Sequence, residues 1–139
     1  MHLDTVLGFV DCDAVTLHPP VVDGMRVYSI RPGSKDDTFD VEEEPGLVSA
    51  LEAALGVSEL RVIPTGGDAF RSAREQWDDA NNVVALEPGV VVAYSKNTAT
   101  NAALRAAGIE VIEVEGGELG KGRGGCHCMT CPLQRDGLD

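Results

Sequence analysis

The sequence has few aromatic residues, few basic residues and no long apolar run. Only 4% of its 139 residues are aromatic, and 11 lysines and arginines stand against 23 aspartates and glutamates, which gives a net charge of -12. An acidic surface repels a phosphate backbone and an anionic membrane, so we expect neither nucleic acid nor a membrane as a partner. No apolar stretch approaches the roughly 20 residues that span a bilayer. The N-terminal residues lack the basic and apolar regions of a secretory leader, and we expect a cytoplasmic protein.

Cysteine is also scarce, and its positions do not suit a disulfide framework. The chain has four cysteines, and Cys126, Cys128 and Cys131 lie within one six-residue stretch. Small secreted proteins instead spread their cysteines along the chain, because each disulfide joins distant segments. The cluster therefore indicates a functional site.

Three kinds of site remain open for this cluster. A zinc site would draw its fourth ligand from His127, His2 or Cys12, but the spacing lacks a second ligand pair. A redox pair would use the Cys-x-x-Cys of Cys128 and Cys131, although no thioredoxin-like strand precedes it. A nucleophilic thiolate would need a histidine and acids from elsewhere in the chain. The spacing alone does not decide among these alternatives.

The hydrophobic content and periodicity predict one α/β (α+β) domain over residues 1–139. Hydrophobic residues make up 43% of the chain, enough to bury one modest core. Strands are expected over residues 3–10, 14–17, 25–30, 60–63, 83–86, 90–94 and 109–114, and helices over 47–55, 69–77 and 97–107. The polar stretch 34–44 predicts a solvated loop. We expect Trp77 to hold its helix on the core and side chains of residues 97–100 to cap the last helix.

The order of these elements indicates two similar units followed by a loop. A hairpin, a helix and a strand occur in residues 1–63 and again in residues 60–114, while residues 115–139 contain the cysteine cluster. Units of this kind need neighbours to bury a shared core. The loop has six glycines between positions 116 and 125, which permit close approach to a small ligand. Arg123 among these glycines is suited to binding a carboxylate.

Two segments resemble arginine deiminases closely. Residues 1–6 (MHLDTV) are similar to the His-Leu-Asp-Thr segment of that family, and residues 122–130 (GRGGCHCMT) to its Gly-Arg-Gly-Gly-x-x-Cys-Met-Ser/Thr segment. Residues 74–77 and 81–91 are also similar, so the resemblance covers essentially the whole chain. It implies a partial pentein fold, with about two of the ββαβ units that surround the active site in a pseudo-fivefold α/β propeller. It also implies hydrolysis of a guanidinium group, arginine to citrulline and ammonia, although the sequence does not decide between arginine and another guanidino compound as the substrate.

The resemblance also implies roles for particular residues. Cys128 would attack the guanidinium carbon and form an S-alkylthiouronium intermediate. His2 would protonate the departing ammonia and then activate water, while Asp4, on the same strand face as His2, would hold the guanidinium nitrogens. Arg123 and Gly122 would bind the substrate carboxylate or gate the cysteine loop. No metal or other cofactor is implied.

The chain departs from the family in length. Arginine deiminases are much longer, and they carry acidic residues in Phe-x-Arg-Asp and Glu-Gly-Gly-Asp segments that this sequence lacks in context. We therefore expect a C-terminal fragment with little or no activity alone, which a complementing N-terminal chain would complete. The alternatives are a non-catalytic subunit that assembles with a partner chain or as a homo-oligomer, and a zinc module.

Overall fold

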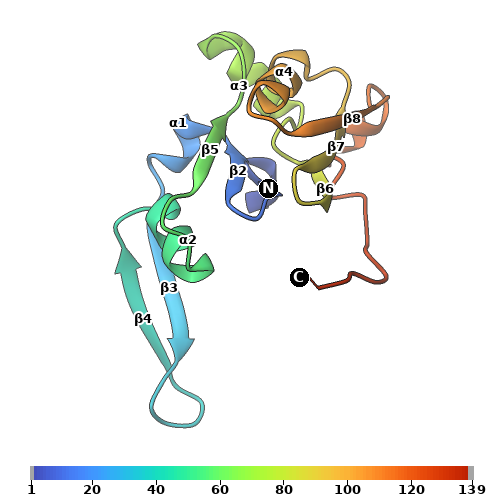
Figure 1. The fold of residues 1–139 in the computed structure, drawn as a ribbon. Helices are drawn as coiled ribbons and strands as arrows, with labels where there is room; N and C mark the ends of the chain where they lie inside the picture. Colours follow the sequence, from blue (N-terminus) through green and yellow to red (C-terminus); the bar gives the residue numbers. More distant parts are fainter. Residues whose placement is uncertain (1, 138–139) are drawn as a thin grey trace.

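The computed structural model describes residues 2–137 as a mixed α/β protein with three small sheets (Figure 1). Its elements are η1 (Leu3–Thr5), β1 (Leu7–Asp11), β2 (Ala14–Leu17), α1 (Pro19–Val22), β3 (Val27–Pro32), β4 (Phe39–Glu44), α2 (Leu47–Leu55), β5 (Arg61–Pro64), α3 (Ala69–Trp77), β6 (Val84–Glu87), β7 (Val90–Tyr94), α4 (Thr98–Ala106), β8 (Glu110–Val114) and η2 (Leu119–Gly122). No helix within the described range is long and apolar enough to cross a membrane.

Two of the sheets share one topology. In β1-β2-β5 and in β6-β7-β8 the first two strands are antiparallel and the third joins the second in parallel. A parallel third strand needs a crossover connection, which α4 supplies in the second sheet. The first sheet uses the longer segment that contains α1, the β3–β4 hairpin and α2. Both sheets therefore combine an antiparallel strand pair with a parallel third strand that follows a helix, as in the ββαβ units that the resemblance implies, and the first connection also contains the β3–β4 hairpin.

The two sheets share a hydrophobic core. Val10 of the first sheet packs in one buried cluster with Val91 of the second sheet and Leu104 of α4. At the seam, the Gly89 amide donates to the Val10 carbonyl at 2.9 Å. Gly8 lies so close to the Asn81 carbonyl that any side chain there would collide with the backbone. The sheets are thus packed as one body, which brings their connecting loops together.

The N-terminal residues form a tight turn where the sequence predicts a strand. Leu3–Thr5 is a 3-10 helix, and β1 begins only at Leu7. The Thr5 amide and Oγ1 both donate to the His2 carbonyl, at 3.2 and 2.9 Å, and this bends the chain. The prediction that His2 and Asp4 share one strand face is therefore wrong.

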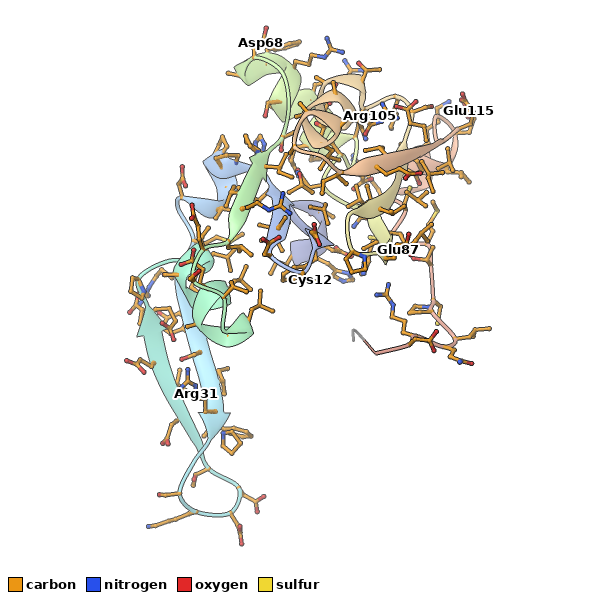
Figure 2. All side chains as sticks on the ribbon, in the orientation of Figure 1. Cys12, Arg31, Asp68, Glu87, Arg105 and Glu115 are labelled. Carbon is orange, nitrogen blue, oxygen red and sulfur yellow. The ribbon has the colours of Figure 1, made fainter. Side chains whose placement is uncertain are left out.

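The acidic stretch is the second difference, because residues 39–44 form β4 instead of a loop. This strand pairs with β3 along its whole length, from Val27 opposite Glu44 to Pro32 opposite Phe39. Phe39 and Val41 alternate with acidic residues, which is a strand pattern, although the acidic composition alone predicts a loop. The hairpin projects away from the two larger sheets (Figure 1), and the labelled Arg31 lies on it, far from the other marked side chains (Figure 2).

Helices α3 and α4 are anchored differently from the expectation. Trp77 is 53% exposed, so it does not hold α3 on the core, and the buried residue of α3 is Glu75. Asn97 makes no side-chain cap to α4, and its Nδ2 donates to the Asp78 carbonyl at 3.0 Å. The Glu75 carboxylate caps α4 instead, accepting hydrogen bonds from the amides of Ala99 and Thr100 at 3.0 and 2.8 Å.

His18 should make stability depend on pH. Its side chain is buried, with Nδ1 3.2 Å from Thr65 Oγ1, and burial lowers its pKa below 6.5. Because the unfolded chain binds this proton more readily, stability should fall as pH drops below about 6.5, by at most ~1.4 kcal/mol per pH unit. Urea unfolding of His18→Gln between pH 7 and 5 should show a shallower pH dependence. Identical slopes for the two proteins would contradict this assignment.

Candidate active site

The cysteine loop lies against the N-terminal turn. Cys128 Sγ is 3.5 Å from Asp4 Oδ2, although the two residues are 124 positions apart. His127 Nδ1 is 3.0 Å from the same carboxylate oxygen. The structure thus brings together a thiol, a carboxylate and an imidazole from the two segments that the sequence analysis singled out.

Asn82 organises this contact. Its Oδ1 accepts the Cys128 amide at 3.0 Å, while its Nδ2 donates to Cys128 Sγ at 3.2 Å and to the Asp4 carbonyl at 3.0 Å. The side chain is only 1% exposed. Gly125 packs against it so closely that a Cβ would collide with it. The sequence analysis included Asn82 in a family-like segment but did not predict this role. The pair of asparagines just before a buried strand is the feature of the sequence that indicates a polar contact here.

Cys128 opens onto a cavity of about 490 Å³. The residues lining this Cys128 cavity are His2, Thr5, Trp77, Asp79, Arg123, Gly124 and Cys128. His2 and Arg123 therefore share a cavity with the thiol, and Asp4 reaches the thiol from a neighbouring cavity that His127 also lines. Gly122 ends η2 and is exposed, outside the described lining of the Cys128 cavity.

The Asp4 carboxylate has the charge and the unpaired oxygen that a cationic ligand requires. Burial alone would raise its pKa, but hydrogen bonds from His127 and Cys128 lower the pKa below its usual value. Its Oδ2 accepts these contacts, whereas Oδ1 is shielded from solvent and has no hydrogen-bond partner among residues 2–137. A buried carboxylate oxygen without a donor is costly, and a ligand N–H can satisfy it.

Arg123 forms one wall of the Cys128 cavity. Its guanidinium lies over the Trp77 ring, 4.1 Å from the centroid, in a cation–π contact. The backbone at Arg123 is left-handed, with φ of 66°, and Gly124 follows with φ of 123°. The Tyr94 hydroxyl donates to the Gly124 carbonyl at 3.1 Å and fixes this turn against β7. The loop conformation therefore places Arg123 beside the thiol.

The zinc alternative can be compared with the grouping of metal-ligating side chains around the cysteines. Within residues 2–137, no three His, Cys, Asp or Glu side chains are grouped closely enough to hold an ion. Cys126 is buried in a cluster with Val84 and Tyr94, and burial raises the pKa of its thiol. All four cysteines are free thiols. The zinc alternative therefore lacks the grouped donors it requires.

Comparison with known proteins shows the family of the chain. The family model described as arginine deiminase matches residues 1–135. This chain belongs to the arginine deiminase family. Arginine deiminases of Rhodococcus erythropolis (strain PR4 / NBRC 100887) and Rhodococcus opacus (strain B4) are each 49% identical over 138 residues. Those matches cover 99% of this chain and 34% of each relative, so the chain spans about a third of the curated arginine deiminases it matches.

A solved structure supports the fold. SxtG, an amidinotransferase from Microseira wollei in the saxitoxin biosynthetic pathway, superposes with a TM-score of 0.62 at 18% sequence identity. The match covers 99% of this chain and 34% of that protein. At such low identity the likeness bears on the fold alone. The family member described here therefore has a partial pentein fold.

Proposed function

We propose that this chain supplies the nucleophilic part of an arginine deiminase active site, which hydrolyses L-arginine to L-citrulline and ammonia. The observation that carries the proposal is the buried, unpartnered Oδ1 of Asp4, on a carboxylate whose other oxygen lies 3.5 Å from Cys128 Sγ. A guanidinium is planar and has forked N–H donors, so it can satisfy that oxygen while its carbon faces the sulfur.

The first half of the reaction displaces ammonia. The Cys128 thiolate attacks the guanidinium carbon, and a new C–S bond forms. Asp4 holds the guanidinium nitrogens during the attack, because an ionised carboxylate near a forming tetrahedral centre stabilises its positive charge. The C–N bond then breaks, His2 gives a proton to the leaving nitrogen, and an S-alkylthiouronium remains on Cys128.

The second half uses water. His2, now neutral, takes a proton from a water molecule that attacks the same carbon. The C–S bond then breaks and restores the Cys128 thiolate, and the added hydroxyl loses its remaining proton to solvent as the citrulline carbonyl forms. His2 lines the Cys128 cavity and is exposed, which lets water reach it for this second step.

The other end of the substrate would meet Arg123. Its guanidinium is in the Cys128 cavity and carries forked donors for a carboxylate. Gly122 and Gly124 flank it, and backbone without side chains leaves room for the substrate main chain. We infer that Arg123 binds the α-carboxylate of arginine while Asp4 binds the guanidinium.

The isolated chain should turn over arginine negligibly. We infer that the family's two further acidic segments, absent here, also position the guanidinium, and each preorganised contact is worth roughly 3 kcal/mol. Replacing the corresponding C-terminal third of the Rhodococcus erythropolis enzyme with this chain should restore citrulline formation. In that chimera Cys128→Ser should lower kcat by at least about 1,000-fold.

The matched control for this experiment is Cys131→Ser, which removes an exposed thiol outside the lining of the Cys128 cavity among the described residues. It should leave kcat within about twofold of the chimera, since it touches no reacting atom. Turnover by the isolated chain near that of the whole Rhodococcus enzyme would refute the proposed incompleteness. Full activity of the Cys128→Ser chimera would refute the nucleophile.

Self-association is the second candidate function, and the β3–β4 hairpin favours it. Ile30, Val41 and Phe39 lie on one face of this ribbon and are 65, 61 and 70% exposed. Burying such a face against a second copy would remove apolar area from water. Light scattering should then show a concentration-dependent dimer, and Val41→Lys should weaken it at least tenfold, whereas Asp40→Lys on the opposite face should not. A monomer at all concentrations would exclude this function.

A further inference from the structure

A further cavity borders the Arg123–Trp77 stack. Its volume is about 420 Å³, and its lining includes Arg74, Lys96, Lys121, Arg123, Trp77 and Asp78. Four of the chain's 11 lysines and arginines therefore surround one cavity in a protein whose net charge is -12. We refer to it as the basic cavity. Arg123 and Trp77 also line the Cys128 cavity, so the stacked pair forms a common wall.

The positive charge of the basic cavity is only partly neutralised. One carboxylate, that of Asp78, serves two cations, Lys96 at 3.1 Å and Arg74 at 3.5 Å. Lys121 pairs with Glu118 at 2.7 Å, but both side chains are at least 70% exposed. Exposed ion pairs of this kind contribute little free energy to stability. The Asp79 carboxylate also interacts electrostatically with Lys96 and Arg123. Four cations therefore face three carboxylates, which leaves a surplus of one positive charge.

Arg123 and Lys96 are held in positions suited to a ligand. The Arg123 guanidinium has one face on the Trp77 ring, which leaves its N–H edge available for an acceptor in the same plane. The Lys96 ammonium is 5.7 Å from the Tyr94 ring centroid and only 2.9 Å from the point where a Cβ of Gly120 would lie. Its side chain is 28% exposed, so contacts on several sides fix this cation.

We propose that the basic cavity binds a compact dianion of the phosphate class, either inorganic phosphate or a phosphate monoester. The net charge of the cavity is positive, and tetrahedral phosphate oxygens accept hydrogen bonds both from the forked donors of an arginine and from the ammonium of a lysine. The cavity is larger than a phosphate ion, so it also has room for part of an organic group. The bound anion would compete for the Arg123 edge with any ligand of the Cys128 cavity.

Calorimetric titration of the 139-residue chain with inorganic phosphate tests the proposal, with chloride holding the ionic strength constant. We expect one saturable site with a dissociation constant of about 1 mM or lower. Arg74→Gln and Lys121→Gln should each weaken binding at least fivefold. Both side chains are about 70% exposed, so neither change should disturb folding. Lys35→Gln, on the turn of the β3–β4 hairpin, is the matched control and should bind as the original chain does.

Titration with AMP distinguishes the two sources of the phosphate group. Tighter binding of AMP than of phosphate would identify a monoester ligand, and equal binding would identify the phosphate group alone. Heats that do not saturate by about 20 mM phosphate, or equal weakening by Lys35→Gln, would overturn the proposal. Cys128→Ser should leave phosphate binding unchanged, so failure of the proposed deiminase activity and failure of this site are separate outcomes.

Discussion

Asn82→Ala is expected to lower the free energy of unfolding by about 3 kcal/mol and to free the loop that carries Cys128. The substitution removes the acceptor of the Cys128 amide and the donor to the Asp4 carbonyl, both at 3.0 Å. These backbone groups are then left without their partner in a region where Asn82 itself is 1% exposed. Leaving such groups unsatisfied costs more than the net value of the hydrogen bonds.

Two measurements check the expectation for Asn82. Urea unfolding gives the free energy, and amide hydrogen exchange over residues 125–130 should be faster in the variant. Asn82→Asp is the matched control, because it keeps an acceptor for the Cys128 amide but loses the Nδ2 donor to Asp4 and Sγ. Its exchange should lie between those of the other two proteins. Unchanged exchange in Asn82→Ala would mean that other contacts hold the loop.

Glu75→Ala should produce a second large loss, of roughly 3–4 kcal/mol. The Glu75 carboxylate is 4% exposed and accepts from the amides of Ala99 and Thr100 and from the Thr100 hydroxyl, at 2.7–3.0 Å. It also forms an ion pair with the Arg71 guanidinium at 3.1 Å. Alanine would leave the start of α4 uncapped and a buried volume empty, and these two costs add.

Glu75→Gln is the informative comparison for that loss. Glutamine has nearly the same shape and keeps one acceptor oxygen, but it has no charge to interact with the amides and with Arg71. We expect a loss of about half that of alanine, measured by urea unfolding at pH 7. A loss below about 0.5 kcal/mol for Glu75→Ala would show that water or Asn97 replaces the carboxylate as the cap.

The elements that the sequence predicted well are those with local signals. The strands of the β6–β7 hairpin flank Pro88 and Gly89, which specify a tight turn, and β7 occupies the predicted residues 90–94. Helix α2 spans the predicted residues 47–55, and its C-cap Gly56 has φ of 69°. In each case a few neighbouring residues determine the backbone, so no tertiary contact is needed to find the element.

Most of the features that the sequence did not predict depend on contacts between residues far apart in the chain. Residues 3–5 have a strand composition, but Thr5 bends them by bonding to the His2 carbonyl. Trp77 has the composition of a core residue, yet it meets Arg123, which arrives from a distant loop. The roles of Asn82 and Glu75 also depend on partners far along the chain. Local patterns contain no information about such partners.

The site was anticipated by resemblance more than by spacing. Nothing in the local pattern relates Asp4 to Cys128, and only the family motifs suggested that they act together. The structure places them in contact, whereas the catalytic roles of these residues, and of His2 and Arg123, stay predictions until the chimera is assayed. The division into units 1–63 and 60–114 likewise stays a prediction, although the two sheets share their topology.

The separate β3–β4 hairpin has an evolutionary consequence. Its strands pair only with each other among the described sheets, and it lies apart from the loops that hold Asp4 and Cys128 (Figure 1). Insertions, deletions and substitutions in its turn would alter no hydrogen bond among Asp4, Asn82, His127 and Cys128. Selection can therefore reshape this ribbon in one lineage or shorten it in another while the contacts around Cys128 are inherited unchanged.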